Sequence, residues 1–68
     1  MDTVDMIEFT DLDSGDEAFA FVRAARGRVA LCLSLRTDGD LEVFFTPAEC
    51  KRLIGVLQRA VVIAEPRH

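Results

Sequence analysis

The sequence predicts one small α+β domain over residues 1–68, an antiparallel meander of three to four strands packed on one C-terminal helix, in the order β-β-β-β-α. Two observations support this fold class. Residues 29–35 and 41–46 alternate between large apolar side chains and smaller or polar ones, which is the period of a strand. Residues 47–64 instead repeat their apolar side chains at the spacing of an amphipathic helix.

A turn around Gly39 joins the two C-terminal strands. Apart from Phe44, the large apolar residues of both strands carry odd numbers, so a loop with an odd number of residues is needed to place them on one face. A three-residue loop over residues 37–39, with glycine in the left-handed conformation, meets that requirement. The register then predicts the pairs Leu35–Leu41, Leu33–Val43 and Arg36–Asp40.

The helix has a clear start signal. Thr46 and Glu49 form the capping box T-x-x-E, and a proline occupies the first helical position. Pro66 ends the helical pattern, and we expect Arg67 and His68 to fray. We expect one apolar stripe of the helix to cover the odd face of the sheet. The stripe comprises Cys50, Leu53, Ile54, Leu57, Ala60, Val61 and Ala64.

The first half of the chain is more ambiguous. Residues 6–10 alternate as a first strand. Residues 15–26 could form a helix, because residues 14–17 spell a second capping box and alanines follow, which gives the alternative order β-α-β-β-α. We favour a strand, because Phe19 and Phe21 continue the odd-numbered apolar set and a three-residue loop over residues 25–27 repeats the glycine-terminated turn. This register predicts the pairs Phe21–Leu31 and Phe19–Leu33.

The strand interpretation leaves the even face of the sheet uncovered. Ala20, Cys32 and Phe44 are predicted to line up across it, and a contiguous exposed apolar patch is typical of a contact surface. We therefore expect a homodimer or another protein at this face, with Phe44 as the central anchor. The flank of the helix is a second candidate. The predicted interaction surface consists of Ala20, Val22, Ala30, Cys32, Phe44, Val56 and Ile63.

Charge is unevenly distributed. The chain has a net charge of −4, yet seven acids and no base precede Arg23, so the remainder is slightly basic. An acidic segment of this kind suits a partner with a basic surface. The run D-L-D-S-G-D partly matches a calcium loop, but its glycine comes fifth and position twelve is Val22, so we expect no metal. The candidate electrostatic contacts are Asp11, Asp13, Asp16, Glu17, Arg23, Arg26 and Arg28.

Catalytic signals are missing from the sequence. It has no phosphate-binding glycine loop, and its single histidine is the last residue. The two cysteines, Cys32 and Cys50, are predicted on opposite sides of the sheet as free thiols, which suits the cytoplasm. No apolar run reaches the length of a membrane span, and the acidic start lacks the basic region of a secretory signal. We expect a cytoplasmic protein that is not an enzyme, with no cofactor and no membrane contact.

The segment from Leu41 to Leu57, with the motif T-P-A-E-C-K-R-L after antiparallel strands, resembles small single-stranded-DNA-binding transcription cofactors. That resemblance implies a dimer that binds single-stranded nucleic acid, whereas the negative net charge disfavours nucleic acid. In style the chain also resembles compact acidic phage proteins that inhibit a host nucleic-acid-binding complex. The residues themselves favour a non-catalytic regulatory or inhibitory protein that acts through protein–protein contacts as a homodimer. Single-stranded nucleic-acid binding is the alternative, and a phage-type inhibitor is the further one.

Overall fold

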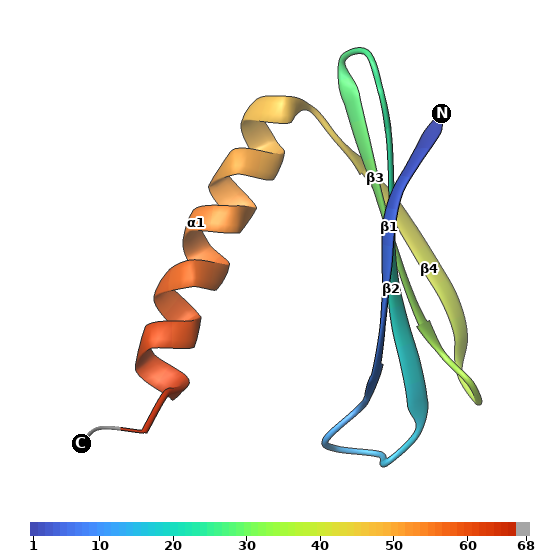
Figure 1. Cartoon of the computed structure of the whole chain (residues 1–68), viewed down its shortest axis with the longest axis vertical. Helices are drawn as coiled ribbons and strands as arrows, with labels where there is room; N and C mark the ends of the chain where they lie inside the picture. The colour runs from blue at the N-terminus through green and yellow to red at the C-terminus, as the bar shows by residue number, and fades with distance from the viewer. Residues whose placement is uncertain (67–68) are drawn as a thin grey trace.

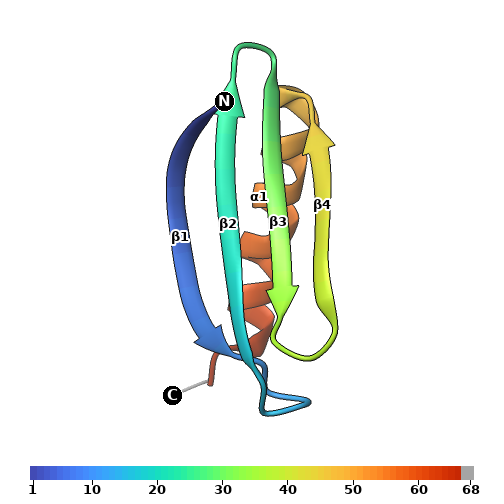
Figure 2. The same cartoon turned by 90° about the vertical axis from the view of Figure 1, so that its right-hand side faces the viewer.

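The computed structural model describes residues 1–66 and confirms the predicted β-β-β-β-α fold. The strands β1 (Asp2–Thr10), β2 (Glu17–Ala25), β3 (Arg28–Leu35) and β4 (Gly39–Phe45) form one antiparallel sheet in sequential order (Figure 2), and α1 (Pro47–Ala64) follows. Residues 17–25 are a strand, so the helical alternative for this segment is wrong. The prediction that Arg67 and His68 fray lies outside the described residues.

Glycines shape the hairpin turns as expected. Gly27 and Gly39 have φ angles of 81° and 83°, in the left-handed region that glycine adopts without steric cost. The predicted registers are nevertheless wrong at both hairpins.

At the β2–β3 hairpin the loop has two residues, because Ala25 pairs with Arg28. Odd residues of β2 therefore face even residues of β3. Phe21 lies opposite Cys32 rather than Leu31, and Phe19 lies opposite Ser34 rather than Leu33. The prediction from odd and even positions is wrong here because both the odd and the even residues of β2 are largely apolar, so the strand specifies its register weakly. Its sequence is E-A-F-A-F-V-R-A-A.

At the β3–β4 hairpin odd residues lie opposite odd residues, as predicted, but the register is shifted by two residues. Leu35 lies opposite Gly39 and Leu33 opposite Leu41, so the loop spans residues 36–38. Arg36 does not pair with Asp40, because Asp40 lies opposite Ser34; the backbone N–H of Arg36 donates to the carbonyl of Glu17 at 3.1 Å. This bond ties the loop to β2 instead of β4.

The observed registers define two faces of the sheet. The helix-side face carries Asp5, Ile7, Phe9, Ala18, Ala20, Val22, Ala24, Val29, Leu31, Leu33, Leu35, Leu41, Val43 and Phe45. The outer face carries Thr3, Met6, Glu8, Thr10, Phe19, Phe21, Arg23, Ala30, Cys32, Ser34, Asp40, Glu42 and Phe44.

The predicted capping box is present at the start of α1. The Glu49 N–H donates to Thr46 Oγ1 at 3.2 Å, and the Thr46 N–H donates to Glu49 Oε1 at 2.9 Å. Two orphan donors of the first turn are thereby satisfied, and the chain leaves β4 at a fixed angle.

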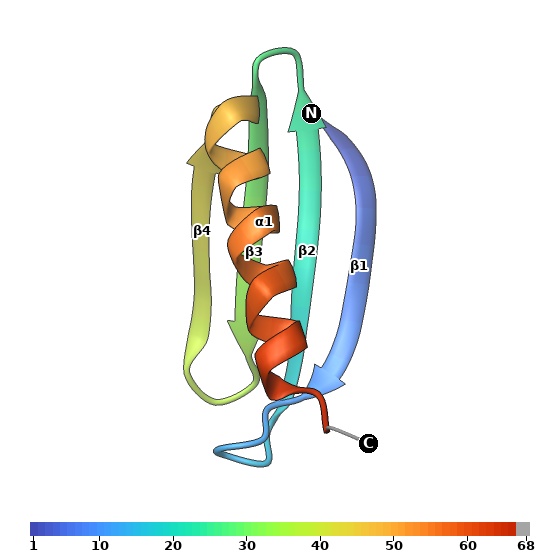
Figure 3. The same cartoon turned by 90° about the vertical axis from the view of Figure 1, so that its left-hand side faces the viewer.

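As predicted, α1 lies on the side of the sheet that carries the odd residues of β3 and β4, but it covers this face only in part. From its start beside β4, α1 diverges from the sheet towards its C-terminal end (Figure 1), and along its length it runs across β3 (Figure 3). It approaches β3 and β4 only, and none of its residues is buried. Among the described residues only Ala18 and Ala30 are buried, at 6% and 1% exposure.

The chain is correspondingly expanded. Its radius of gyration is 13.7 Å, whereas a compact domain of this length has about 11 Å. The difference follows from the open angle between helix and sheet.

Candidate interaction surfaces

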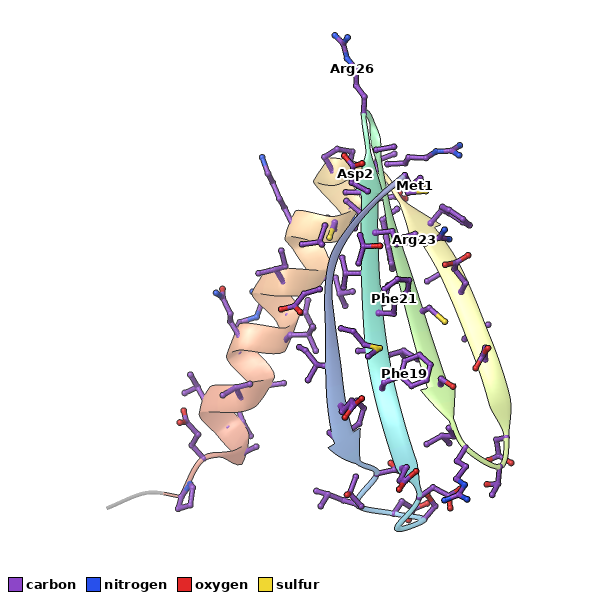
Figure 4. All side chains as sticks on the ribbon, turned by 45° about the vertical axis from the view of Figure 1, so that its right-hand side comes forward. Met1, Asp2, Phe19, Phe21, Arg23 and Arg26 are labelled. Atoms are coloured by element: carbon purple, nitrogen blue, oxygen red, sulfur yellow. The ribbon has the colours of Figure 1, made fainter. Side chains whose placement is uncertain are left out.

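The outer face carries a cluster of three phenylalanines that the sequence analysis did not predict to lie on one face. Phe19 and Phe21 project from β2 on the side of the sheet away from α1, beside Arg23 (Figure 4), and Phe44 projects from β4 on the same face. Phe44 is 52% exposed and the two β2 phenylalanines are half-buried. The face is therefore apolar at its centre and open to solvent.

Arg23 bridges this face from β2 to β4. Its Nη2 atom donates to Glu42 Oε2 at 2.7 Å, across the β3 strand that separates them. Ala30 lies between Arg23 and Phe44 in the register, which explains why its small side chain is almost completely covered. The Nε atom of Arg23 is buried without a hydrogen-bond partner among the described residues. The arginine is thus fixed by one charged contact and retains an unused donor.

A second arginine, Arg28, contacts the aromatic cluster at the end of the sheet near the β2–β3 turn. The guanidinium carbon of Arg28 lies 5.6 Å from the centre of the Phe44 ring, within the range of a cation–π contact. Arg26 extends from the tip of the same hairpin (Figure 4). Arg23, Arg26 and Arg28 therefore gather at one end of the outer face. Glu8, Asp40 and Glu42 occupy the rest of that face, so its charge is mixed.

The predicted interaction residues do not share one surface. Ala30, Cys32 and Phe44 lie on the outer face as expected, but Ala20 and Val22 lie on the helix-side face. This is a consequence of the two-residue β2–β3 loop, which reverses the two sides of β2 relative to β3. Phe19 and Phe21 take their place on the outer face, and their position could not be deduced from the pattern of β2 alone.

The helix-side face and α1 form the second candidate surface. Large apolar side chains of both remain exposed, although they occupy core positions in the periodicity of their elements. Val56 and Ile63, predicted as a contact flank, are exposed on α1 at 51% and 85%. The other exposed apolar residues of this surface are Ile7, Phe9, Leu33, Leu41, Val43, Ile54, Leu57 and Val61.

The acidic turn between β1 and β2 is closed by its own hydrogen bonds. Both the N–H and the hydroxyl of Ser14 donate to Asp11 Oδ2, at 2.9 and 2.6 Å, and these bonds lower the pKa of the Asp11 carboxyl. Thr37 donates to Asp16, which links this turn to the β3–β4 turn. Arg36 lies 3.5 Å from Glu17 in an exposed ion pair. The turn is therefore built as a structural element with an acidic surface.

The Cys32 thiol is held protonated. Its desolvation on the outer face raises its pKa, and the neighbouring carboxylates Asp40 and Glu42 raise it further, against the opposing effect of Arg23. A thiolate is the nucleophilic form, so this cysteine is poorly suited to covalent chemistry. Cys50 lies on α1, on the other side of the sheet, and both thiols are free.

Other kinds of site find little support within residues 1–66. A hollow at the end of the sheet near the β1–β2 and β3–β4 turns combines apolar residues with Ser34 and three aspartates, and the Ser34 hydroxyl donates to Asp40; no histidine, lysine or cysteine lies among its lining residues. No three His, Cys, Asp or Glu side chains of these residues come together as metal ligands. None of the helical segments described is long and apolar enough to cross a membrane. The hollow is lined by Phe9, Asp11, Ala18, Phe19, Leu33, Ser34, Leu35, Asp38, Gly39, Asp40 and Leu41.

Comparison of the chain with protein-family models, with curated proteins and with solved structures finds no match. The surfaces described above are therefore the basis for any functional proposal.

Proposed function

We propose that this chain is a non-catalytic regulatory or inhibitory protein that acts through protein–protein contacts as a homodimer. One observation carries the proposal: apolar side chains are exposed on both faces of a single sheet and along the helix, while only two alanines among residues 1–66 are buried. Monomeric soluble proteins rarely expose contiguous apolar patches of more than a few hundred Å². At least two separate surfaces of this chain therefore suit contact with other molecules.

The outer face is the surface proposed for another protein. Its centre combines three phenylalanines with two arginines, residue types that dominate the energy of protein interfaces when they are desolvated. Its arginines gather at one end and its acids occupy the rest, which favours a partner with complementary charge and steers the encounter. The acidic β1–β2 turn adds negative charge near one end of this face. The reduced thiols fit the predicted cytoplasmic setting.

Affinity capture from the source cell tests this function. Immobilised wild-type protein is compared with Phe44→Asp, which places a charge at the centre of the outer face, and with Gln58→Asp, which adds the same charge to the polar flank of α1. We expect a protein that is retained by wild type and Gln58→Asp and lost with Phe44→Asp, because an unpaired carboxylate is costly to desolvate. If no retained protein responds to Phe44→Asp, the outer face is not the contact surface.

Single-stranded nucleic-acid binding is a second candidate, favoured by the observed position of Phe19 and Phe21 beside Phe44. Aromatic side chains on a sheet serve as stacking platforms for bases, and Arg23, Arg26 and Arg28 lie at one end of the cluster. Fluorescence anisotropy with a labelled oligothymidylate, at low and at high salt, separates the two functions. Nucleic-acid binding predicts an affinity that falls steeply with salt and is weakened by Phe21→Ala. Absence of binding at low salt excludes it.

A further inference from the structure

The helix-side face is a core that the single chain does not complete. The chain exposes 5859 Å², whereas a compact monomer of 7.6 kDa exposes about 4,300 Å². The excess of about 1,600 Å² per chain is twice the roughly 800 Å² that each partner contributes to a standard protein–protein interface. An interface of this size is typical of obligate complexes. The missing contact is therefore extensive and is needed whenever the chain is folded.

The uncovered part of this face has the width of one helix. Four strands spaced about 4.8 Å apart span about 14 Å, and packed helices lie about 8–10 Å apart, so the face can carry two helices side by side. The chain's own α1 approaches β3 and β4 only. The half formed by β1 and β2 is left open: in Figure 3 β1 lies beside α1, and the C-terminal turns of α1, which stand away from the sheet (Figure 1), pass in front of the lower part of β2. Ala18, Ala20 and Ala24 make the β2 part of it shallow enough for close approach by a helix.

The exposed apolar side chains of both elements indicate which helix fits there. Ile7 and Phe9 lie on the helix-side face of β1 and are 60% and 47% exposed. Leu57 and Val61 of the apolar stripe of α1 are each 55% exposed, while Arg52 and Arg59 lie on the opposite side of the helix. A helix with these properties would bury its stripe on β1 and β2 and leave its arginines in solvent.

We infer that the open half of the helix-side face is occupied by α1 of a second copy of this chain, an inference that rests on the homodimer proposed above and assigns its interface. A two-fold axis makes the contact mutual: each copy places its α1 in the open angle between the other copy's sheet and helix. The contact is closed and self-complementary, so it completes both cores without leading to polymers. The two outer faces then point away from each other, and the dimer presents two copies of the aromatic cluster.

Light scattering on matched variants tests the assignment. Leu57 belongs to the apolar stripe and is 55% exposed in the single chain, while its neighbour Gln58 lies on the polar flank. We expect Leu57→Asp to raise the dimer dissociation constant by about a hundredfold or more, as truncation of a central contact does. Gln58→Asp and the outer-face variant Phe44→Asp should retain the dimer mass. A dimer that survives Leu57→Asp and is lost with Phe44→Asp would overturn the inference and leave the proposed homodimer intact, whereas a folded monomeric wild type would overturn both.

Cross-linking between two differently substituted chains keeps the inference testable if Leu57→Asp fails to fold. In a background with Cys32→Ser and Cys50→Ala, chains carrying Ile7→Cys are mixed with chains carrying Leu57→Cys and treated with a short bismaleimide. Because each chain has a single cysteine, a product that joins the two kinds of chain must be intermolecular. We expect this product in high yield, and a much lower yield when Gln58→Cys replaces Leu57→Cys. Equal yields for the two helix positions would contradict the assignment, as would the absence of a mixed product.

Discussion

The stability of this protein should depend on its concentration. If the second copy completes the core, unfolding and dissociation occur together, and dilution shifts the equilibrium by mass action. A dilution of about a hundredfold lowers the free energy of unfolding per dimer by about 2.7 kcal/mol. With an unfolding entropy of about 2.1 cal/mol/K per residue, two chains of 68 residues have about 0.29 kcal/mol/K. The melting temperature should therefore fall by about 9 °C.

Circular dichroism melts at two protein concentrations measure this shift, since both the sheet and α1 contribute to the signal. The melting temperature of a folded monomer does not depend on concentration. A melting temperature that stays constant over the same dilution, with a cooperative transition, would refute the view that the helix-side face is completed by a second chain. Gln58→Asp provides the control, because a variant that retains the dimer should show the same dependence on dilution as wild type.

Three further predictions concern local features. Thr46→Ala should destabilise the protein by about 1 kcal/mol in urea unfolding, because it removes the hydroxyl of the capping box, while Thr46→Ser should stay close to wild type; equal loss in both would contradict this role. The hydrogen bonds from Thr46 lower the pKa of the Glu49 carboxyl. The stability that this carboxylate adds is therefore present above its ordinary pKa of 4.5 and is lost as the pH falls through the lower folded value. Thermal melts of wild type and Glu49→Gln should differ at neutral pH and converge in acid. The raised pKa of Cys32 keeps its thiol protonated, so in the Cys50→Ala variant Cys32 should react with iodoacetamide more slowly in the folded protein than in urea. Equal rates would show that the outer face does not protect this thiol.

The strands and the helix of the C-terminal half were predictable because several local signals agree there, although the predicted register of β3 on β4 was wrong by two residues. Alternation in β3 and β4, a positive φ at Gly39 and the capping box of α1 all point to the same arrangement. The register of β2 was not predictable, because apolar side chains occupy both of its faces and either pairing buries some of them. Phe19 and Phe21 were therefore assigned to the core, although they form most of the aromatic cluster on the outer face.

The separation of α1 from its own sheet could not be read from the sequence either. An apolar stripe such as that of Leu53 and Leu57 is equally compatible with the sheet of the same chain and with that of another copy. Periodicity identifies which side chains avoid water but not which molecule covers them. The position of α1 relative to β3 and β4 shows that the chain's own helix leaves much of this face exposed.

An isotope-filtered nuclear Overhauser experiment on a mixture of labelled and unlabelled chains tests the central claim most directly, because it reports only contacts between copies. The two-fold assembly predicts intermolecular signals between the methyl groups of Leu57 or Val61 in one copy and those of Ile7 or Val22 in the other. Intermolecular signals confined to Phe44 and its neighbours on the outer face would contradict it, and so would a folded protein with no intermolecular signals at all.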